Sequence, residues 1–139
     1  ADLGCGNGVL GIVAAIRNPT AEVLFFYESF MALASAEENS ARLIPDTVRS
    51  FIIANGLEGI TECSMDLVLC NPPFHTNRAI DETVPWRFIK HAYKALRPGG
   101  QLCIVGQNSL RHELKLKRIF GGCRQLANNK KFSVLYAEK

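Results

Sequence analysis

The chain has 139 residues, of which 47% are hydrophobic, and a formal net charge of +3. This length and composition predict one globular domain, and no segment reaches the roughly 20 apolar residues that a membrane-spanning helix needs. The five cysteines are odd in number and contain no Cys-x-x-Cys pair, so they predict buried free thiols in a reducing cytoplasm and argue against a zinc site.

The first motif is a glycine-rich turn at residues 2–8. Its sequence, Asp-Leu-Gly-Cys-Gly-Asn-Gly, predicts the end of a strand, and the apolar residues 9–17 after it predict a helix. Glycines at alternate positions allow positive φ angles and a close approach of the backbone to a ligand. A nicotinamide dinucleotide is disfavoured, because its fingerprint would place the third glycine where Val9 stands. The candidate cofactor-binding residues of the turn are Asp2, Gly4, Cys5, Gly6, Asn7 and Gly8.

A second predicted strand, residues 22–28, ends in Glu28. An acid at this position can accept hydrogen bonds from both ribose hydroxyls of an adenosine that lies across the switch point of a parallel sheet. A helix is predicted next at 30–42 and a strand at 49–54. The glycine turn and Glu28 together therefore predict a nucleoside cofactor.

The most specific motif is Asn-Pro-Pro-Phe at residues 71–74, directly after a strand predicted at 65–70. Asn71 can accept both N–H bonds of a planar amine through its side-chain and backbone carbonyls, which leaves the lone pair of the amine pointing forward. Pro72 and Pro73 fix two φ angles and donate no competing N–H, and Phe74 offers a ring on which a base can stack. Taken alone, the motif could equally be a turn that closes a buried strand. The glycine turn and the acid upstream favour the chemical interpretation.

The remaining sequence continues to alternate between helices and strands. Helices are predicted at 84–96 and 110–119, a strand at 101–106, and a hairpin of strands at 123–127 and 132–137. Near-continuous apolar runs suit strands that are covered on both faces. The sequence therefore predicts an α/β fold, a doubly wound, mostly parallel sheet with a C-terminal antiparallel hairpin.

One tryptophan and two histidines in the C-terminal part of the chain have competing interpretations. Trp86 could lie over the mouth of a substrate site, but a core anchor at the start of a helix is the more common role. His91 is interpreted as a packing or surface residue, and His112 as part of a basic helix. The third histidine, His75, follows the Asn-Pro-Pro-Phe motif and is not needed as a general base.

Charge is divided unevenly along the chain. Residues 1–83 hold four Lys or Arg against eleven acids, whereas residues 84–139 hold twelve against two, a change from −7 to +10. A basic half of this kind suits contact with a phosphate backbone, although an ordinary solvated helix face is the alternative. The candidate residues for contact with such a backbone, which the resemblance below identifies as RNA, are Arg111, Lys115, Lys117, Arg118, Lys130 and Lys131, with His75 as a positioning residue.

Together, these motifs resemble the S-adenosylmethionine-dependent methyltransferases, in particular the small-domain group that methylates the exocyclic amine of guanine in ribosomal RNA. Residues 2–8 match its cofactor loop, Glu28 its ribose acid, residues 71–74 its catalytic tetrapeptide and residues 96–100 the turn before its fifth strand. The family usually has a polar residue at the adenine amine. Ala54 stands there in this chain, so the resemblance assigns the role to the next residue, Asn55. Residues 114–121 and 128–132 look most like the large-subunit (23S) enzyme and next like the small-subunit (16S) enzyme.

The resemblance implies a Rossmann-like methyltransferase fold and direct methyl transfer from S-adenosylmethionine to guanine N2, leaving S-adenosylhomocysteine. It implies that residues 1–139 are a C-terminal catalytic domain, cut within its first strand, and that a preceding RNA-binding, methyltransferase-like domain is absent. The expected partner is naked or partly assembled ribosomal RNA, and the expected protein is a cytoplasmic monomer without a metal. Three rivals remain: methylation of DNA adenine or of release-factor glutamine, a catalytically silent RNA-binding module, and a nicotinamide oxidoreductase.

Overall fold

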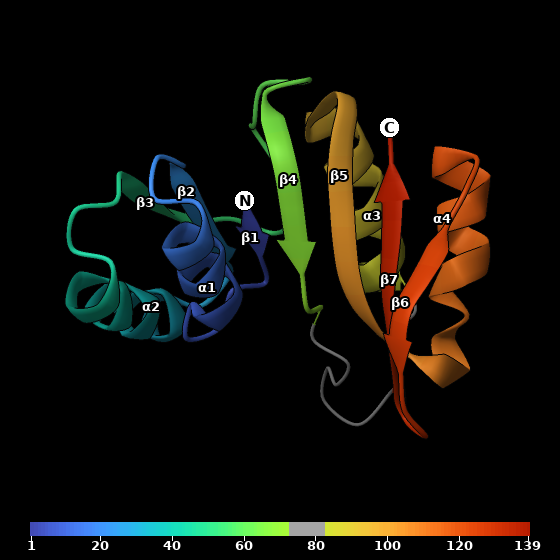
Figure 1. Cartoon of the computed structure of the whole chain (residues 1–139), viewed down its shortest axis with the longest axis horizontal. Coiled ribbons are helices and arrows are strands. Elements are labelled where there is room, and N and C mark those ends of the chain that lie inside the picture. The colour runs from blue at the N-terminus through green and yellow to red at the C-terminus, as the bar shows by residue number, and fades with distance from the viewer. Residues whose placement is uncertain (73–82) are drawn as a thin grey trace.

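The computed structural model describes residues 1–72 and 83–139. Its centre is a seven-stranded sheet in the order β3-β2-β1-β4-β5-β7-β6 (Figure 1). The strands are β1 (Asp2–Leu3), β2 (Val23–Tyr27), β3 (Arg49–Ile53), β4 (Met65–Cys70), β5 (Leu96–Gln107), β6 (Arg124–Asn128) and β7 (Phe132–Glu138). The helices are α1 (Val9–Arg17), α2 (Phe30–Leu43), α3 (Thr83–Ala95), the 3-10 turn η1 (Asn108–Leu110) and α4 (His112–Phe120).

The first five strands are parallel, and β7 and β6 are antiparallel to their neighbours. This confirms the predicted fold class, an α/β doubly wound sheet with a C-terminal hairpin. The hairpin follows from the polar residues 128–131, which separate two segments that pair with each other.

Helices cover both faces of the sheet, and two adjacent phenylalanines show how. Successive residues of a strand point to opposite faces. Phe25 packs in a buried cluster with residues of α1 and α2, whereas Phe26 packs in a second cluster with residues of α3 and α4. Both rings are fully buried. The two cores fix α1 and α2 on one face and α3 and α4 on the other.

Strand β1 lies between β2 and β4, so β2 and β3 are added on one side of it and β4 and β5 on the other. In register, Leu3 pairs with Phe26 of β2 and with Cys70 of β4. The glycine turn and the segments that follow β2 and β4 therefore meet at one edge of the sheet. In doubly wound sheets this edge, at the switch point, is where ligands bind.

Two predicted boundaries are wrong for reasons of tertiary structure. Residues 96–100 were predicted as a turn, but Leu96 already pairs with Met65, and the N–H of Gly99, with φ 75°, donates a 2.7 Å hydrogen bond to the carbonyl of Lys139. The helix predicted at 110–119 is broken at Arg111, whose φ of 46° separates η1 from α4.

The five cysteines are free thiols, as predicted. Their predicted burial holds for Cys5 and Cys70 but is wrong for Cys63, which is exposed on the loop before β4. Among residues 1–72 and 83–139, no helix is long and apolar enough to cross a membrane, and no group of three His, Cys, Asp or Glu side chains could hold a metal ion.

Candidate active site

The glycine turn is held by the neighbouring strand. The N–H groups of Gly4 and Cys5 donate to the same carbonyl, that of Phe26, at 2.9 and 3.0 Å. Gly4 has a φ of 75°, and a Cβ there would stand 3.3 Å from the backbone oxygen of Asn71. A side chain at this position would be strained and would crowd the segment after β4. The turn and the Asn-Pro-Pro-Phe motif are therefore in close contact through Gly4.

Asp2 lies beneath the turn. Its carboxylate is fully buried, and Oδ2 accepts a 2.8 Å hydrogen bond from the N–H of Gly11 in α1. Burial raises the pKa of Asp2 to about 6, against the opposing effect of this hydrogen bond. Asp2 thus faces α1 and stabilises the helix that follows the turn, and its predicted cofactor contact stays a prediction.

The other residues of the turn differ in how far they are exposed. Burial raises the pKa of the Cys5 thiol to about 12, so Cys5 is a neutral packing residue at physiological pH. The backbone carbonyl of Asn7 accepts a 3.0 Å hydrogen bond from Asn39 of α2, and its side chain is exposed. Gly8 is buried, with a φ of 86°, and a Cβ there would stand 3.1 Å from that of Ala36. Gly8 therefore allows α1 and α2 to pack closely, while Gly6 has open space around it.

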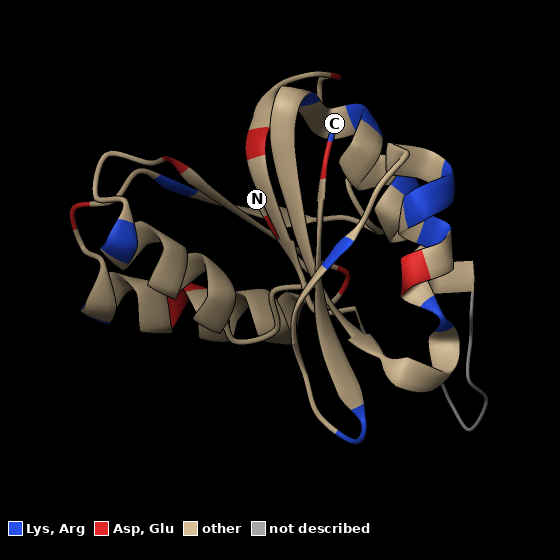
Figure 2. Ribbon diagram, turned by 45° about the vertical axis from the view of Figure 1, so that its right-hand side comes forward, with Lys and Arg blue, Asp and Glu red and all other residues tan. Residues whose placement is uncertain are grey.

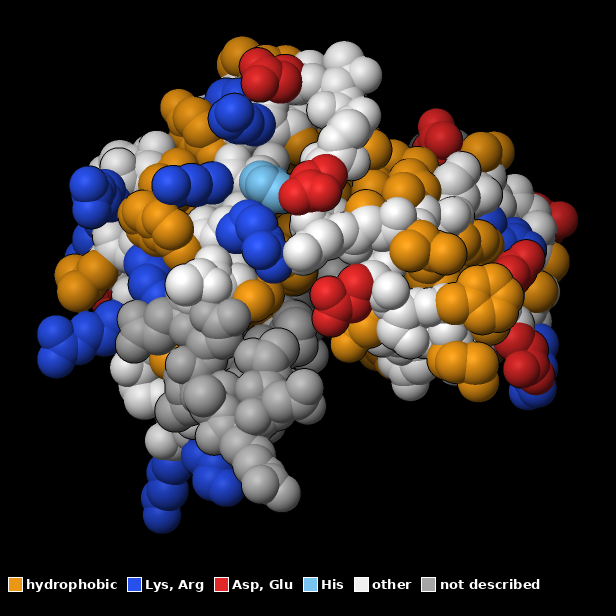
Figure 3. All heavy atoms as spheres, turned by 180° about the vertical axis from the view of Figure 1, so that it is seen from behind, with side chains coloured by type: hydrophobic (Ala, Val, Ile, Leu, Met, Phe, Trp, Pro, Cys, Tyr) orange, Lys and Arg blue, Asp and Glu red, His pale blue; other side chains and the backbone are white. Residues whose placement is uncertain are grey.

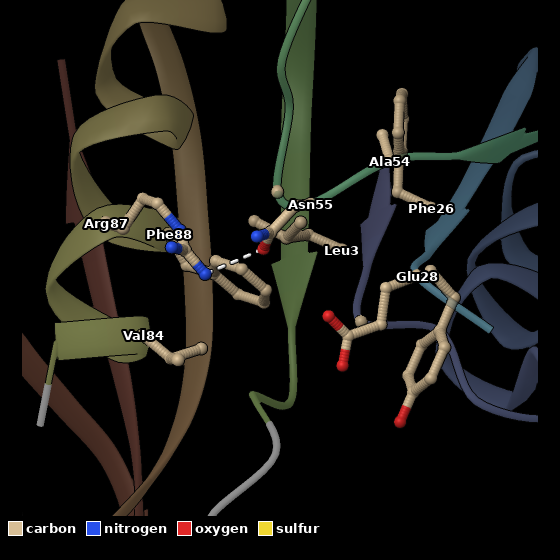
Figure 4. Close-up of a pocket in the computed structure, with 11 residues that line it drawn as sticks. Leu3, Phe26, Glu28, Ala54, Asn55, Val84, Arg87 and Phe88 are labelled. Carbon is tan, nitrogen blue, oxygen red and sulfur yellow. Dashed lines mark hydrogen bonds between the residues drawn. The ribbon is translucent and has the colours of Figure 1, made fainter. Parts of the chain in front are cut away.

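A pocket opens at the carboxyl edge of the sheet (Figure 4). One wall comes from the ends of β1 and β2, the second from the segment after β3, and the third from the first turns of α3. Its lining residues are Leu3, Gly4, Phe26, Tyr27, Glu28, Ala54, Asn55, Gly56, Val84, Arg87 and Phe88. The carboxylate of Glu28 points into the pocket (Figure 4). The structure thus brings together three residues that the sequence nominated for the cofactor, namely Gly4, Glu28 and Asn55.

Two residues of α3 that the sequence analysis did not assign to the site hold the wall opposite Glu28. The guanidinium of Arg87 donates a 2.7 Å hydrogen bond to Oδ1 of Asn55 (Figure 4). His91 accepts a 3.2 Å hydrogen bond at Nδ1 from the N–H of Leu57, and partial burial lowers its pKa. A Cβ at Gly56 would stand only 2.5 Å from that nitrogen. His91 therefore stabilises the loop that carries Asn55, which replaces the packing or surface role predicted for it.

One signal in the sequence could have found both residues. Val84, Arg87, Phe88 and His91 recur with the spacing of one helix face, and two of the four are buried apolar residues. A cation and an imidazole on an otherwise apolar face need polar partners across the interface. The loop after β3 supplies those partners.

The Asn-Pro-Pro-Phe motif is described only in part. Asn71 is exposed directly after β4, and Pro72 is fully buried. Pro73, Phe74 and His75 lie outside the described residues. The amine-presenting role of the motif stays a prediction, supported by the position of Asn71 beside Gly4 at the edge where the pocket opens.

The candidate RNA-binding residues share one half of the molecule. Lys and Arg residues are concentrated on α3, α4 and the β6–β7 hairpin, as the blue ribbon segments of Figure 2 show, and Figure 3 shows basic side chains from behind. Lys130 and Lys131 lie at the hairpin turn, just past the carboxyl end of β5, where Gln107 pairs with Phe132. Arg111 is exposed at the start of α4, which places it at the same edge as the pocket.

The candidates on α4 differ in their partners. Lys117 forms a 2.6 Å ion pair with Glu113, which reduces its value as a phosphate contact. Arg118 is exposed and lies over the ring of Trp86. Lys115 is half-buried. The six residues thus form a broad basic half rather than one compact patch.

The chain belongs to the methyltransferase small domain family, whose model matches residues 1–136. The family inferred from the sequence motifs is thereby confirmed. The chain is 48% identical to the ribosomal RNA large subunit methyltransferase G of Yersinia enterocolitica over 141 aligned residues, which cover 100% of the chain and 36% of that protein. The chain therefore spans about a third of the length of the curated relatives it matches.

Comparison with solved structures also finds methyltransferases. The 16S rRNA N2 methyltransferase RsmC of T. thermophilus, in complex with AdoMet and guanosine, superposes with a TM-score of 0.84 at 29% identity, covering 99% of this chain and 36% of that one. A predicted O-methyltransferase of Agrobacterium tumefaciens superposes with a TM-score of 0.78 at 20% identity, covering 99% and 72%. The second likeness concerns the fold alone.

Proposed function

We propose that the chain is the cofactor-binding and catalytic part of an enzyme that transfers a methyl group from S-adenosylmethionine to the exocyclic N2 amine of a guanine in large-subunit (23S) ribosomal RNA. The observation that carries the proposal is the close contact between Gly4 and the carbonyl of Asn71, beside a pocket that contains Glu28. It brings the glycine turn and the Asn-Pro-Pro-Phe motif to one edge of the sheet, as the proposed reaction requires. The names of the similar proteins point the same way.

The residues that line the pocket are chemically suited to parts of the cofactor. Its apolar walls, which include Leu3 and Phe88, suit a purine, and the inward-pointing carboxylate of Glu28 suits a ribose diol. Gly4 adds no side chain to the space between the cofactor turn and Asn71. When bound, S-adenosylmethionine supplies an electrophilic methyl group.

The residues of the chain then act by positioning. Glu28 accepts hydrogen bonds from the ribose, and Asn55 meets the edge of the base. Asn71 accepts the N–H bonds of the guanine amine through its two carbonyls, which directs the amine lone pair toward the methyl group. Alignment and desolvation of two reactants can lower a barrier by about 7 to 11 kcal/mol at best. Proton loss needs no dedicated base, because the methylated amine is acidic enough to release its proton to solvent.

RNA contact is assigned to the basic half of the chain. Arg111, Lys130 and Lys131 stand at the edge where the pocket opens and can position a phosphate backbone without reading its sequence. The target base must be unstacked to reach the pocket, which favours naked or partly assembled ribosomal RNA. A further RNA-binding domain in the whole protein, a cytoplasmic location and a monomeric state belong to this proposal.

The alternative is guanine N2 methylation in small-subunit (16S) ribosomal RNA, which the structural similarity to RsmC favours. One experiment decides between the substrates. The intact protein is incubated with labelled cofactor and, separately, with protein-free 23S rRNA, 16S rRNA, DNA and a release factor. Label confined to 23S rRNA, mapped by mass to one N2-methylguanine, is the expected result. Label in another substrate instead would overturn the assignment.

A further inference from the structure

Trp86 occupies neither of the two places that the sequence suggested for it. It is half-buried in the first turn of α3 and does not line the pocket, whereas its neighbours Val84 and Arg87 do. Its ring faces two cations: Lys90 Nζ lies 5.1 Å and the guanidinium carbon of Arg118 lies 5.7 Å from the ring centroid. Trp86, Lys90 and Arg118 therefore form a small cluster, here named the Trp86 cluster, between α3 and α4.

Packing between these two helices does not require the cluster. Ile89 and Leu116 are fully buried in the core cluster that α3 and α4 share. Tyr93 and Phe120 add an edge-to-face ring pair with centroids 5.1 Å apart. Lys90 and Arg118, in contrast, are exposed. A contact whose only task was to join the helices would gain more from apolar side chains than from two exposed cations.

Several cations in the basic half of the chain, residues 84–139, lie over aromatic rings. Within residues 84–139, ammonium or guanidinium groups lie over aromatic rings in four contacts, from Lys90 and Arg118 to Trp86, from Arg124 to Tyr136 and from Lys139 to Tyr93. A ring orders a cation without neutralising it, whereas a carboxylate cancels its charge. Lys90, Arg118, Arg124 and Lys139 are therefore ordered with their positive charge intact, unlike Lys117, which is paired with Glu113.

We propose that the Trp86 cluster is a second RNA-contact site, which binds a single-stranded segment that flanks the target guanine. The indole stacks against a nucleobase, and Lys90 and Arg118 contact the phosphates on either side of it. Single-stranded nucleic acid is bound in this way, by aromatic rings that stack bases beside cations that follow the backbone. Position supports the assignment, because Trp86 precedes Arg87 on the helix that forms one wall of the pocket. The proposal rests on the proposed function, since RNA is the partner in both.

The test uses the fact that Trp86 is the only tryptophan of the chain. Its fluorescence therefore reports on this cluster alone. We expect a short single-stranded oligouridylate to quench this fluorescence in a saturable way, with a midpoint equal to the dissociation constant from anisotropy of the labelled oligonucleotide. Binding by anisotropy without any change in Trp86 fluorescence would overturn the proposal, and so would the absence of binding.

Substitutions in the Trp86 cluster distinguish base stacking from phosphate contacts. Trp86→Leu keeps an apolar side chain at the helix interface and is expected to weaken binding roughly 5- to 150-fold, the range for loss of one stacked base. The double variant Lys90→Gln with Arg118→Gln is expected to lower the slope of log affinity against log salt by about 1.4, because each single-strand phosphate contact contributes about 0.7. Arg17→Gln, at the end of α1 in the acidic half, is the control and should change neither quantity. Equal effects of Arg17→Gln and the double variant would mean that Lys90 and Arg118 act only through a general attraction for RNA and not through a specific site.

The two proposals can fail independently. Calorimetry with S-adenosylhomocysteine tests the cofactor pocket, which none of these variants alters. Normal cofactor binding together with an unresponsive Trp86 would remove the second site and leave the methyltransferase assignment intact. The absence of cofactor binding by the unchanged chain would count against the proposed function instead.

Discussion

Arg87 and Asn55 join across the mouth of the pocket through a 2.7 Å hydrogen bond from Nη2 to Oδ1. This contact links α3 to the loop after β3, two elements on opposite sides of the switch point. A guanidinium can only donate hydrogen bonds, so the amide of Asn55 must turn its oxygen to Arg87. The NH2 group of Asn55 is then left to face a ligand, where it can donate to an acceptor nitrogen of the base but cannot accept from the adenine amine, the role expected from the sequence.

Arg87→Met should weaken the binding of S-adenosylhomocysteine. The methionine keeps the apolar stem against the helix but loses the donor that orients Asn55, so the ligand must order this side chain on binding, at a cost of about 0.5 to 1.5 kcal/mol. We expect the dissociation constant from calorimetry to rise roughly 2- to 13-fold. Lys94→Met, an exposed position of the same helix, is the control. An unchanged constant for Arg87→Met would mean that Asn55 does not need its partner.

Glu28→Gln should also weaken cofactor binding, because it removes a charged acceptor, whereas Arg87→Met removes a charged donor. The pocket wall formed by β2 then offers a neutral amide in place of a carboxylate, and the ribose hydroxyls lose charge-assisted acceptors. Calorimetry should show a loss of about tenfold or more. Glu22→Gln, just before the same strand and also exposed, leaves the pocket unaltered. Equal binding by the Glu28 variant and the unchanged chain would contradict the ribose assignment.

Asn71→Ala should separate chemistry from binding. The side-chain carbonyl that accepts an amine N–H is removed, but the residue does not line the pocket that contains Glu28. We expect methyl transfer by the intact protein to fall about 100-fold or more, as expected for a misplaced reactant, while the affinity for S-adenosylhomocysteine stays within about twofold. Retained turnover would exclude Asn71 from the reaction.

The sequence predicted the fold and nominated three of the residues that line the pocket, because both depend on local signals. Apolar runs that end in Gly4, Glu28 or Asn71 identify strand ends without knowledge of tertiary contacts. Arg87 and His91 were not assigned to the site because their roles depend on how α3 packs against the loop after β3. That packing brings together residues more than 30 positions apart.

The same distinction explains the errors at element boundaries. The break at Arg111 and the early start of β5 arise from the fold, the latter from pairing with Met65 and from the hydrogen bond between Gly99 and Lys139. Helical spacing on α4 could not reveal the break, because the residues on both sides of it are compatible with a helix. Trp86 was assigned to the core on frequency alone, and only the structure places Arg118 beside it.

Asp2 gives a prediction about stability and pH. Its pKa is about 6 in the folded chain against an ordinary value of 3.8, because burial penalises the carboxylate. Between pH 4 and 6 the folded state therefore binds a proton that the unfolded state has lost, so the free energy of unfolding should fall as pH rises through this window, by about 3 kcal/mol. Urea denaturation of the unchanged chain should show this decline in the free energy of unfolding between pH 4 and 6. In Asp2→Asn the amide oxygen can still accept the hydrogen bond of Gly11, and the decline between pH 4 and 6 should disappear. If the decline persists in this variant, another carboxylate must be its cause.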